Sequence, residues 1–266
     1  MNDKLCAIVI PVYKELTDKY EELSFRQCLK ILHNYPIYLL THEDLPLSRY
    51  DGIAKEYNIK LGRVFFDPSF FTSIAGYNRL MMSKTFYQSL AAHQYILIYQ
   101  LDAFIFKDEL KYWCNQGYDY IGAPWMINDK GEMLDRSLWT VGNGGLSLRK
   151  VSHCLKVLSW KGPVIKYRKI KYLPYMLGWQ NTIRYFKKSG LNEDGLFSGL
   201  LSPSYIHYNV PSPEVAAHFA FERFPSYLFD ICNHQLPFGC HAFLKFEYDE
   251  FWKHYIEKDE TLNHNS

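Results

Sequence analysis

The sequence lacks the features that mark several large classes of protein. Its six cysteines are scattered, with no C-x-x-C pair and no zinc-like spacing, so neither a disulfide framework nor a structural zinc site is indicated. The apolar stretch at the N-terminus ends at Pro11 and is too short for a signal peptide core or a membrane span. The formal net charge of +2 gives no reason to expect nucleic-acid binding. These absences favour a reducing cytoplasm.

The chain does have length, apolar residues and many aromatic rings. With 266 residues, 48% of them hydrophobic, it can bury one substantial core. We expect a single domain over residues 1–258 and a flexible tail over 259–266. Aromatic residues make up 17% of the sequence. They suit a carbohydrate or nucleotide site, where flat rings stack on a ligand, and they suit an ordinary packed core equally well.

Strand-like and helix-like segments alternate through the first half of the chain. The β-branched run that ends at Pro11 predicts a first strand, and the spacing of apolar residues over 17–33 predicts a helix after it. The pattern continues with strands expected over 35–42, 59–66 and 95–106, and with helices expected over 48–58 and 77–93. This order predicts an α/β fold with a mostly parallel sheet flanked by helices. Ligands of such sheets bind beyond the carboxyl ends of the strands.

The segment YILIYQLDAFIF, residues 95–106, sets a carboxylate into the most strand-like part of the chain. An unpaired charge inside a central strand is costly, so we expect Asp102 at the carboxyl end of the strand, facing the ligand cleft. There it can hold a divalent metal ion against the phosphates of a nucleotide. The alternative is an ordinary cap of the turn or helix that follows, and periodicity alone does not separate the two.

Further motifs follow one another in a recognisable order. They are GYNRLMMSKTFY (76–87), YDYIGAPW (118–125), VGNGGLSLR (141–149), NEDGLFSG (192–199) and PFGCHAF (237–243). Together with the segment over 95–106, they resemble the DUF5672 family of bacterial glycosyltransferase-like proteins. The resemblance implies a GT-A fold, a nucleotide-sugar donor and a cytoplasmic enzyme of surface-polysaccharide or glycolipid assembly. It also implies a nucleotide-binding half over residues 1–125 and an acceptor-side half over 126–258.

The same resemblance gives the segment around Asp102 a role in binding the donor and a metal ion. GT-A enzymes carry an acidic D-x-D element after the fourth strand, and its place is taken here by Gln100, Leu101 and Asp102. Because the first acid is a glutamine, the ion needs either another protein ligand or more water and phosphate oxygens, and the resemblance implies His241 as the protein ligand. Mn²⁺ or Mg²⁺ is the expected ion. A lone histidine beside a glycine is otherwise as easily a core or surface residue.

Two more motifs carry candidate site residues. By spacing alone, the glycines around Asn143 favour a tight turn with positive φ, whereas the resemblance implies that Asn143, Gly144 and Gly145 contact the donor sugar. Glu193 and Asp194 fit a helix N-terminus, where acids cap and stabilise. The resemblance instead implies that Asp194 is the catalytic base of an inverting enzyme and that Glu193 holds an acceptor hydroxyl.

The remaining candidate contacts come from three other places in the chain. The resemblance implies nucleobase contacts at the end of the first strand, from Pro11, Val12 and Tyr13. Arg79 and Lys84 are candidates for the nucleotide, although solvated helix charges are the usual explanation for such residues. Trp125 is a candidate for stacking on an acceptor sugar, with sealing of the core as the favoured alternative.

No acidic residue occurs between Asp135 and Glu193, although the interval holds many lysines and arginines mixed with tyrosine and tryptophan. A solvated basic face is the plain interpretation. The other hypothesis is peripheral association of residues 160–188 with an anionic membrane surface, where each cation is worth about 1 kcal/mol. A lipid-linked acceptor at the inner membrane face fits that hypothesis. No recognisable nucleic-acid-binding module accompanies the basic residues.

These expectations describe a metal-dependent glycosyltransferase of the hexosyltransferase class, for which an inverting mechanism is favoured and a retaining mechanism is the alternative. Its donor is expected to be a nucleotide-diphosphate sugar, with UDP-sugar favoured, and its acceptor a glycan or lipid-linked glycan in capsule, lipopolysaccharide or other surface-polysaccharide assembly. The alternative is a GT-A-like protein that binds carbohydrate or nucleotide without catalysis, which Gln100 makes credible. A sugar nucleotidyltransferase is disfavoured because no glycine-rich, arginine-containing loop follows the first strand.

Overall fold

The computed structural model describes most of the chain, in eight segments. These are residues 4–126, 137–161, 164–167, 180–181, 183–184, 192–199, 201–203 and 206–257. The expected tail over 259–266 lies outside them. In the described part of the chain, no helix has the length and apolar content of a membrane span.

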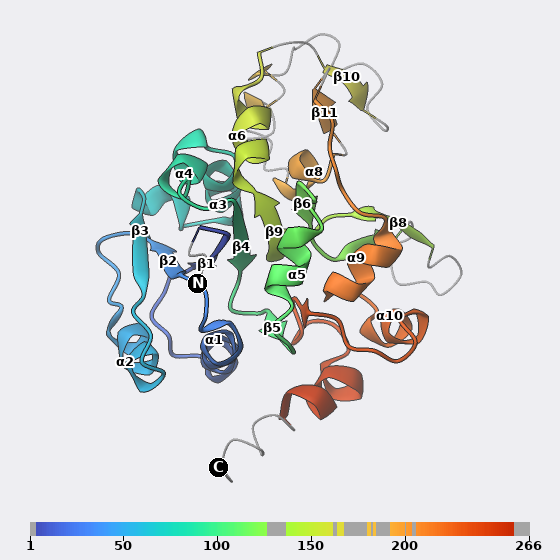
Figure 1. The fold of residues 1–266 in the computed structure, drawn as a ribbon. Helices are drawn as coiled ribbons and strands as arrows, with labels where there is room; N and C mark the ends of the chain where they lie inside the picture. The colour runs from blue at the N-terminus through green and yellow to red at the C-terminus, as the bar shows by residue number, and fades with distance from the viewer. Residues whose placement is uncertain are drawn as a thin grey trace.

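Strands and helices alternate through the first half of the chain, as the sequence predicts (Figure 1). The elements are β1 (Cys6–Pro11), α1 (Lys19–Leu32), β2 (Ile37–Thr41), α2 (Ser48–Glu56), β3 (Gly62–Phe65), a short 3₁₀ helix (Pro68–Phe70), α3 (Ile74–Met81), α4 (Lys84–Ser89) and β4 (Tyr95–Tyr99). The helix expected over 77–93 is therefore two helices. Ser83 separates them, because its side chain accepts the backbone N–H of Phe86 at 3.3 Å and caps α4.

The second half is built from shorter elements. They are β5 (Phe104–Ile105), α5 (Leu110–Asn115), β6 (Tyr120–Ile121), β7 (Pro124–Met126), β8 (Leu138–Val141), β9 (Leu146–Lys150), α6 (Val151–Ser159), β10 (Val164–Tyr167), α8 (Asp194–Phe197), β11 (Leu201–Pro203), α9 (Pro213–Phe219), β12 (Ala220–Phe221), α10 (Pro225–Ile231), β13 (Gly239–Cys240) and a π-helical turn (Tyr248–Trp252). The strand expected over 95–106 thus ends at Tyr99, and Asp102 lies in the turn that leads to β5.

The central sheet has the strand order β3-β2-β1-β4-β9-β6. Strands β3, β2, β1 and β4 run parallel, whereas β9 pairs antiparallel with both β4 and β6. Every residue of β1 and β4 is buried, which accounts for their continuous apolar sequences, since strands covered on both faces need no polar alternation. The mostly parallel sheet that the sequence predicts is confirmed.

A three-stranded sheet, β12-β13-β5, joins the C-terminal region to the turn after β4. Gly239 pairs with Ile105 and Cys240 pairs with Phe104. This register carries the chain just after β13 back to the turn that holds Asp102. His241 and Asp102, far apart in the sequence, are thereby brought together at one edge of the central sheet.

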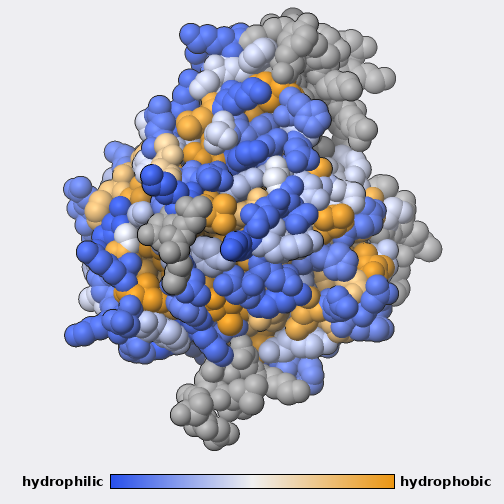
Figure 2. Space-filling view, viewed as in Figure 1, coloured by the Kyte–Doolittle hydropathy of each residue, from blue (hydrophilic) through white to orange (hydrophobic). Residues whose placement is uncertain are grey.

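Two apolar cores lie on either side of this junction. The larger surrounds β1 and β4, and the smaller contains Phe104, Phe221 and Trp252. Trp252 is fully buried and stacks on Phe106, with ring centroids 5.6 Å apart. On the surface seen in Figure 2, apolar residues are interspersed among polar ones. The organisation of residues 1–258 as one domain remains a prediction, tested below.

Candidate functional site

A cavity of about 770 Å³ opens beyond the carboxyl ends of β1 and β4. The candidate residues that line it are Pro11, Val12, Tyr13, Gln100, Leu101, Asp102, Trp125, Asn143, Gly144, Gly145, Glu193, Asp194 and His241. Arg79 and Lys84 do not belong to this lining, and Lys84 is exposed on α4. The sequence therefore identified most of the cavity wall but not the cations beside it. Lys14 and Arg223 line the cavity instead.

Asp102 and His241 meet at one end of the cavity. His241 Nε2 lies 3.2 Å from Asp102 Oδ1 and 3.2 Å from Gln100 Oε1. The other ring nitrogen, Nδ1, lies 3.2 Å from Oε1 of Glu222, which directly follows β12. Glu222 was not among the site residues predicted from the sequence. Its only signal was a single acid at the end of the apolar run HFAFE, the same kind of signal that drew attention to Asp102.

These contacts shift the proton affinities of both groups. Burial lowers the pKa of His241, but the charges of Asp102 and Glu222 and their hydrogen bonds outweigh burial and raise that pKa to about 10. Burial also acts against the charge of Asp102, whose pKa is nevertheless held below its usual value by the charge and hydrogen bond of His241. Two carboxyl groups therefore lie beside one imidazole at this end of the cavity, and a cation that binds Nε2 of His241 must displace the proton there.

The donor set at this end of the cavity fits a divalent cation. Within the described ranges, no three His, Cys, Asp or Glu side chains form a metal-binding group. The amide oxygen of Gln100, however, joins the carboxylate of Asp102 and the imidazole of His241. Oxygen donors with one imidazole are compatible with Mn²⁺. Glu222 holds the far nitrogen of the ring, an arrangement that orients metal-binding histidines in many proteins.

In the loop between β8 and β9, three glycines each pack against the side chain of a candidate site residue. A Cβ atom at Gly142 would overlap the Trp125 indole, one at Gly144 would overlap the Glu193 carboxylate, and one at Gly145 would overlap the His241 ring. This loop, residues 142–145, is called the glycine loop below. Its glycines are needed because other side chains occupy the space of a Cβ.

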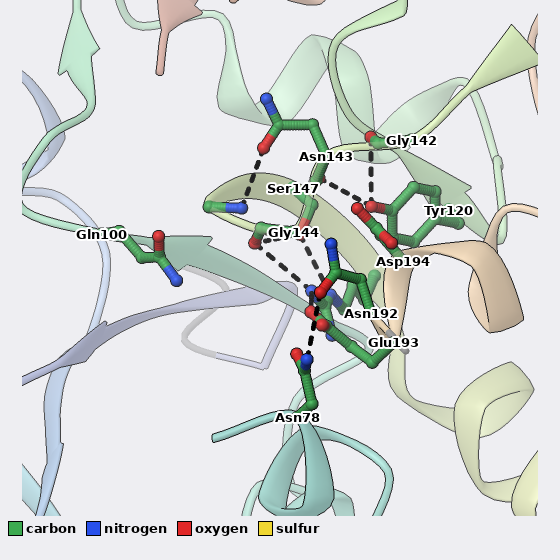
Figure 3. A network of polar contacts seen from close by, with 12 residues as sticks. Asn78, Gln100, Tyr120, Gly142, Asn143, Gly144, Ser147, Asn192, Glu193 and Asp194 are labelled. Atoms are coloured by element: carbon green, nitrogen blue, oxygen red, sulfur yellow. Dashed lines mark hydrogen bonds and ion pairs between the residues drawn. The ribbon is translucent and has the colours of Figure 1, made fainter. Parts of the chain in front are cut away.

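The positive φ expected at these glycines is found instead at Asn143, whose φ is 67°. Its side-chain Oδ1 accepts the backbone N–H of Gly145 at 3.0 Å. Figure 3 shows the Asn143 side chain with this bond as a dashed line. A local hydrogen bond of this kind is the reason that asparagine tolerates the left-handed region. The turn that the sequence predicted is present, with the positive φ at the asparagine. The glycines approach other side chains of the protein, and their contact with a donor sugar remains a prediction.

Glu193 and Asp194 lie at the start of α8, where the Glu193 carboxylate packs against Gly144, the neighbour of the glycine that His241 contacts. Glu193 is only 3% exposed, and its Oε1 lies 2.7 Å from Arg149 Nη2. It makes no side-chain capping bond to α8. The Glu193 side chain therefore does not cap the helix; it pairs with Arg149 instead. Arg149 was missed as a site residue, although it is a charge set into the apolar strand LSLRK.

Asp194 is a buried carboxylate on the cavity wall. Its side chain accepts the backbone N–H of Gly195 at 2.7 Å, and the residue is 6% exposed. Burial and the neighbouring charge of Glu193 raise the pKa of Asp194 to about 7. A carboxylate with a pKa near neutrality can exchange a proton with a bound hydroxyl at physiological pH.

Aromatic side chains form the rim of the cavity. Tyr13 is 58% exposed where the chain leaves β1. Trp125 lines the cavity from β7 and stacks on Trp139 of β8, with ring centroids 6.2 Å apart. Tyr13 is exposed and Trp125 is half-buried at the cavity. Their proposed contacts with a nucleobase and an acceptor sugar remain predictions.

Most of the segment over 160–188, which carries the membrane hypothesis, lies outside the described residues. The described parts are residues 160–161, 164–167, 180–181 and 183–184. The hypothesis therefore has no structural account.

The sequence matches a family model, described as a protein of unknown function (DUF5672), over residues 60–241. The chain belongs to the DUF5672 family. No curated protein matches the sequence of this DUF5672 protein.

Several solved structures of glycosyltransferases have a similar fold. The galactosyltransferase LgtC, in complex with donor and acceptor sugar analogs, has a TM-score of 0.53 at 11% identity, over 88% of this chain and 86% of its own. Mouse xyloside xylosyltransferase 1 has a TM-score of 0.50 at 10% identity, over 90% and 97%. The glycosyltransferase GlyE of Streptococcus pneumoniae TIGR4 has a TM-score of 0.50 at 14% identity, over 90% of this chain but only 54% of GlyE. The DUF5672 protein therefore has the GT-A fold and spans about half the length of GlyE.

Proposed function

We propose that this DUF5672 protein is a metal-dependent glycosyltransferase. The observation that carries the proposal is a single cavity that joins the donor set of Gln100, Asp102 and His241 to a buried carboxylate, Asp194, with a pKa of about 7. The cavity lies beyond the carboxyl ends of β1 and β4, where nucleotides bind in open α/β sheets. The fold is that of proteins whose names describe galactosyl and xylosyl transfer.

Each wall of the cavity has a part in the proposed reaction. Pro11, Val12 and Tyr13 bind the nucleobase, and Asn143 with the glycine loop contacts the donor sugar. A divalent cation held by Gln100, Asp102 and His241 would supply a Lewis acid for the departing diphosphate.

Asp194 acts as the base. It takes the proton of an acceptor hydroxyl while that oxygen forms a bond to the anomeric carbon and the bond from that carbon to the diphosphate breaks. Attack from the face opposite the diphosphate inverts the configuration of the sugar. An NMR assignment of the anomeric proton in the product tests this step, and a retained configuration would contradict the role given to Asp194.

The substrates proposed are a UDP-sugar and a glycan or lipid-linked glycan, as in surface-polysaccharide assembly. Ligand stabilisation follows RT ln(1 + [L]/Kd), so thermal shift in Mn²⁺ ranks candidate nucleotide sugars directly. Peripheral binding to an anionic membrane is part of the proposal and is tested by liposome flotation. Equal failure to bind neutral and anionic vesicles would reject it.

The central experiment measures donor hydrolysis and transfer in Mn²⁺ for the wild type and two variants. Asp194→Asn is expected to lower the rate about 10²–10⁴-fold, the usual contribution of a general base. Asp102→Ala is expected to abolish the dependence on Mn²⁺. Asp51→Asn, which neutralises a surface carboxylate paired with Arg63, is the matched control and should keep the wild-type rate.

A second candidate function is nucleotide or carbohydrate binding without catalysis. Gln100, which stands where GT-A enzymes place an acid, favours it because the metal then has one carboxylate ligand fewer. The same experiment separates the two candidates. Binding of a nucleotide diphosphate with no turnover over a broad donor and acceptor panel would support the second and reject the first.

A further inference from the structure

Arg149 is a fully buried cation beneath the glycine loop. It lies on β9, between its partners Ile96 of β4 and Tyr120 of β6, and its side chain has no solvent exposure. The guanidinium donates to four acceptors, three of which belong to residues labelled in Figure 3, namely Gly144, Ser147 and Glu193. They are Glu193 Oε1 at 2.7 Å, Ser147 Oγ at 3.0 Å, Tyr87 Oη at 3.2 Å and the Gly144 carbonyl at 3.3 Å.

The rings of Tyr120 and Phe197 each lie 5.7 Å from the guanidinium carbon. Strands β4, β6 and β9, the glycine loop and helices α4 and α8 therefore all meet around this one side chain. A group held by four hydrogen bonds and two rings has a single orientation, and it imposes that orientation on Glu193.

A buried ion pair of this kind is a poor device for stability alone. Removing two charges from water is costly, and apolar residues of similar volume often serve a core equally well. A pair that is retained in such a place commonly serves to fix a register or an orientation. The feature next to this pair that needs a fixed orientation is the carboxylate of Asp194.

Asp194 directly follows Glu193 in the chain, so the position of its carboxylate depends on how Glu193 is held. Helix α8 is only four residues long, so it has little internal stability of its own. Its start is tied to the sheet through Glu193 and Arg149, and Gly144 leaves room for the Glu193 carboxylate. The bond from the Gly195 N–H then directs the Asp194 side chain.

We propose that Arg149 and Glu193 form a positioning pair that fixes the carboxylate of Asp194 in the cavity. The proposal rests on the proposed function, in which Asp194 is the base. It assigns Glu193 to Arg149 and not to the acceptor hydroxyl that the sequence resemblance implied. Arg149 itself acts on the substrate only through its neighbours.

The charged and titratable groups that face Asp194 determine how its proton affinity responds to changes in the pair. They are Glu193 beside it, Arg149 of β9, Glu222 after β12 and Tyr120 of β6. Glu193 and Glu222 raise the pKa of Asp194, whereas Arg149 lowers it. Replacing Glu193 with glutamine keeps an oxygen for Arg149 and removes one negative charge, so the pKa of Asp194 should fall.

The first test needs no turnover. Thermal unfolding of the wild type and of Asp194→Asn is measured from pH 4 to pH 9, and the difference between the two midpoints reports the titration of Asp194. The same comparison is made in the Glu193→Gln background. We expect the inflection near pH 7 to move to lower pH in that background. Asp51→Asn, the surface control, should leave the inflection in place.

The second test measures the rate. The double variant Arg149→Met with Glu193→Gln removes both charges, so no unpaired ion is left in the core. We expect it to fold and to keep the KM for the donor nucleotide sugar, while kcat falls about 10²-fold, the cost of misplacing a reacting group by about 1 Å. The matched surface pair, Arg63→Met with Asp51→Asn, should keep both constants.

Two results would overturn the proposal: an inflection that Glu193→Gln does not move, or a double variant with the kcat of the wild type. A different result rejects the proposed function, namely a wild type that turns over no donor. A shifted inflection in a protein without turnover would leave the positioning pair intact and reject the enzyme.

Discussion

The folded protein disfavours the charged form of Asp194, because the carboxylate is buried beside the charge of Glu193. The unfolded chain releases this proton near pH 4, whereas burial and Glu193 raise the pKa of Asp194 to about 7 in the folded protein. Between these two values the folded state holds a proton that the unfolded state has lost. The contribution of Asp194 to stability therefore decreases as the pH rises from about 4 to about 7 and stays unfavourable above that range.

The stability of Asp194→Asn should follow from this sign. Asparagine has no proton to lose, so the variant is expected to unfold at a higher temperature than the wild type at pH 8 and at nearly the same temperature at pH 4. Differential scanning calorimetry at the two pH values measures the difference. An equal gain at both values would mean that packing, and not titration, is responsible.

Turnover should depend on pH in the opposite direction to stability, because it increases as Asp194 loses its proton. The base must be deprotonated to act, so kcat/KM should rise through about pH 7 and then level off. A rate profile for donor transfer between pH 5 and pH 9 measures it. A flat profile across pH 7 would remove Asp194 as the base.

Glu222 lies one contact away from the proposed cation, because it holds one of the proposed ligands. It holds Nδ1 of His241 at 3.2 Å, and residues in this position typically change metal affinity by about 10–100-fold. Glu222→Gln should therefore require more Mn²⁺ for half-maximal activity, by a factor in that range. Asp249→Asn, which removes an exposed carboxylate paired with Lys253, is the control. Unchanged Mn²⁺ dependence in Glu222→Gln would argue against His241 as a ligand.

Among the elements, the glycine loop has the largest influence on the site. It is one turn between two strands, yet it receives an indole, a carboxylate and an imidazole from three other parts of the chain. Its backbone also takes part directly, since the N–H of Gln100 donates to the carbonyl of Gly145 at 2.8 Å. The loop thus connects the Gln100 and His241 end of the cavity to the Asp194 end.

A methyl group at position 145 should disrupt the packing of the glycine loop against His241. Gly145→Ala places a Cβ in the His241 ring, so we expect the ring to move and Mn²⁺-dependent turnover to fall about 10²-fold. Gly52→Ala is the matched control, because a Cβ there meets nothing within 4 Å on α2. It should keep full activity and raise the free energy of unfolding by about 0.4–1 kcal/mol. Equal effects of the two substitutions on turnover would contradict this account of the loop.

The sequence predicts those elements whose signals are local. The strands β1 to β4 are recognisable because a strand buried on both faces has a continuous apolar sequence. The break between α3 and α4 was missed because Ser83 fits a helix by composition and acts as a cap only in the structure. The glycines of the loop were assigned to backbone conformation, because nothing local reveals that distant side chains fill their space.

Contacts between distant residues account for the rest of what was missed. Arg149 and Glu193 are 44 residues apart, and Glu222 meets His241 only after β12 and β13 have paired. Both missed charges nevertheless follow the rule that identified Asp102, because each is a charge at an apolar strand or directly after one. The rule was applied to acids inside strands, and its extension to Arg149 and Glu222 would have found them.

For the whole molecule, the question is whether the two apolar cores unfold together. The smaller core contains Phe104 of β5, and β5 also packs against α1, which covers the larger core. Only four residues separate β4 from β5. Loss of one core should therefore disturb the other.

Trp252→Ala tests this coupling. Trp252 is fully buried in the smaller core, and such truncations cost about 3–5 kcal/mol. We expect one cooperative transition in urea, shifted to lower concentration, with the same midpoint by fluorescence and circular dichroism. Tyr112→Ala, at a side chain that is 55% exposed, should change the free energy of unfolding by no more than about 0.5 kcal/mol. Two separate transitions would divide the chain into two domains.

The pairing of β13 with β5 has a consequence for a chain still being made on the ribosome. Every other candidate contact with the donor precedes residue 200, so the nucleobase and sugar walls can form early in synthesis. His241 reaches Asp102 only after β13 has emerged and added itself to β5. A nascent chain that stops short of β13 therefore lacks the last ligand of the proposed cation, so the proposed transfer would begin only after β13 has joined the sheet.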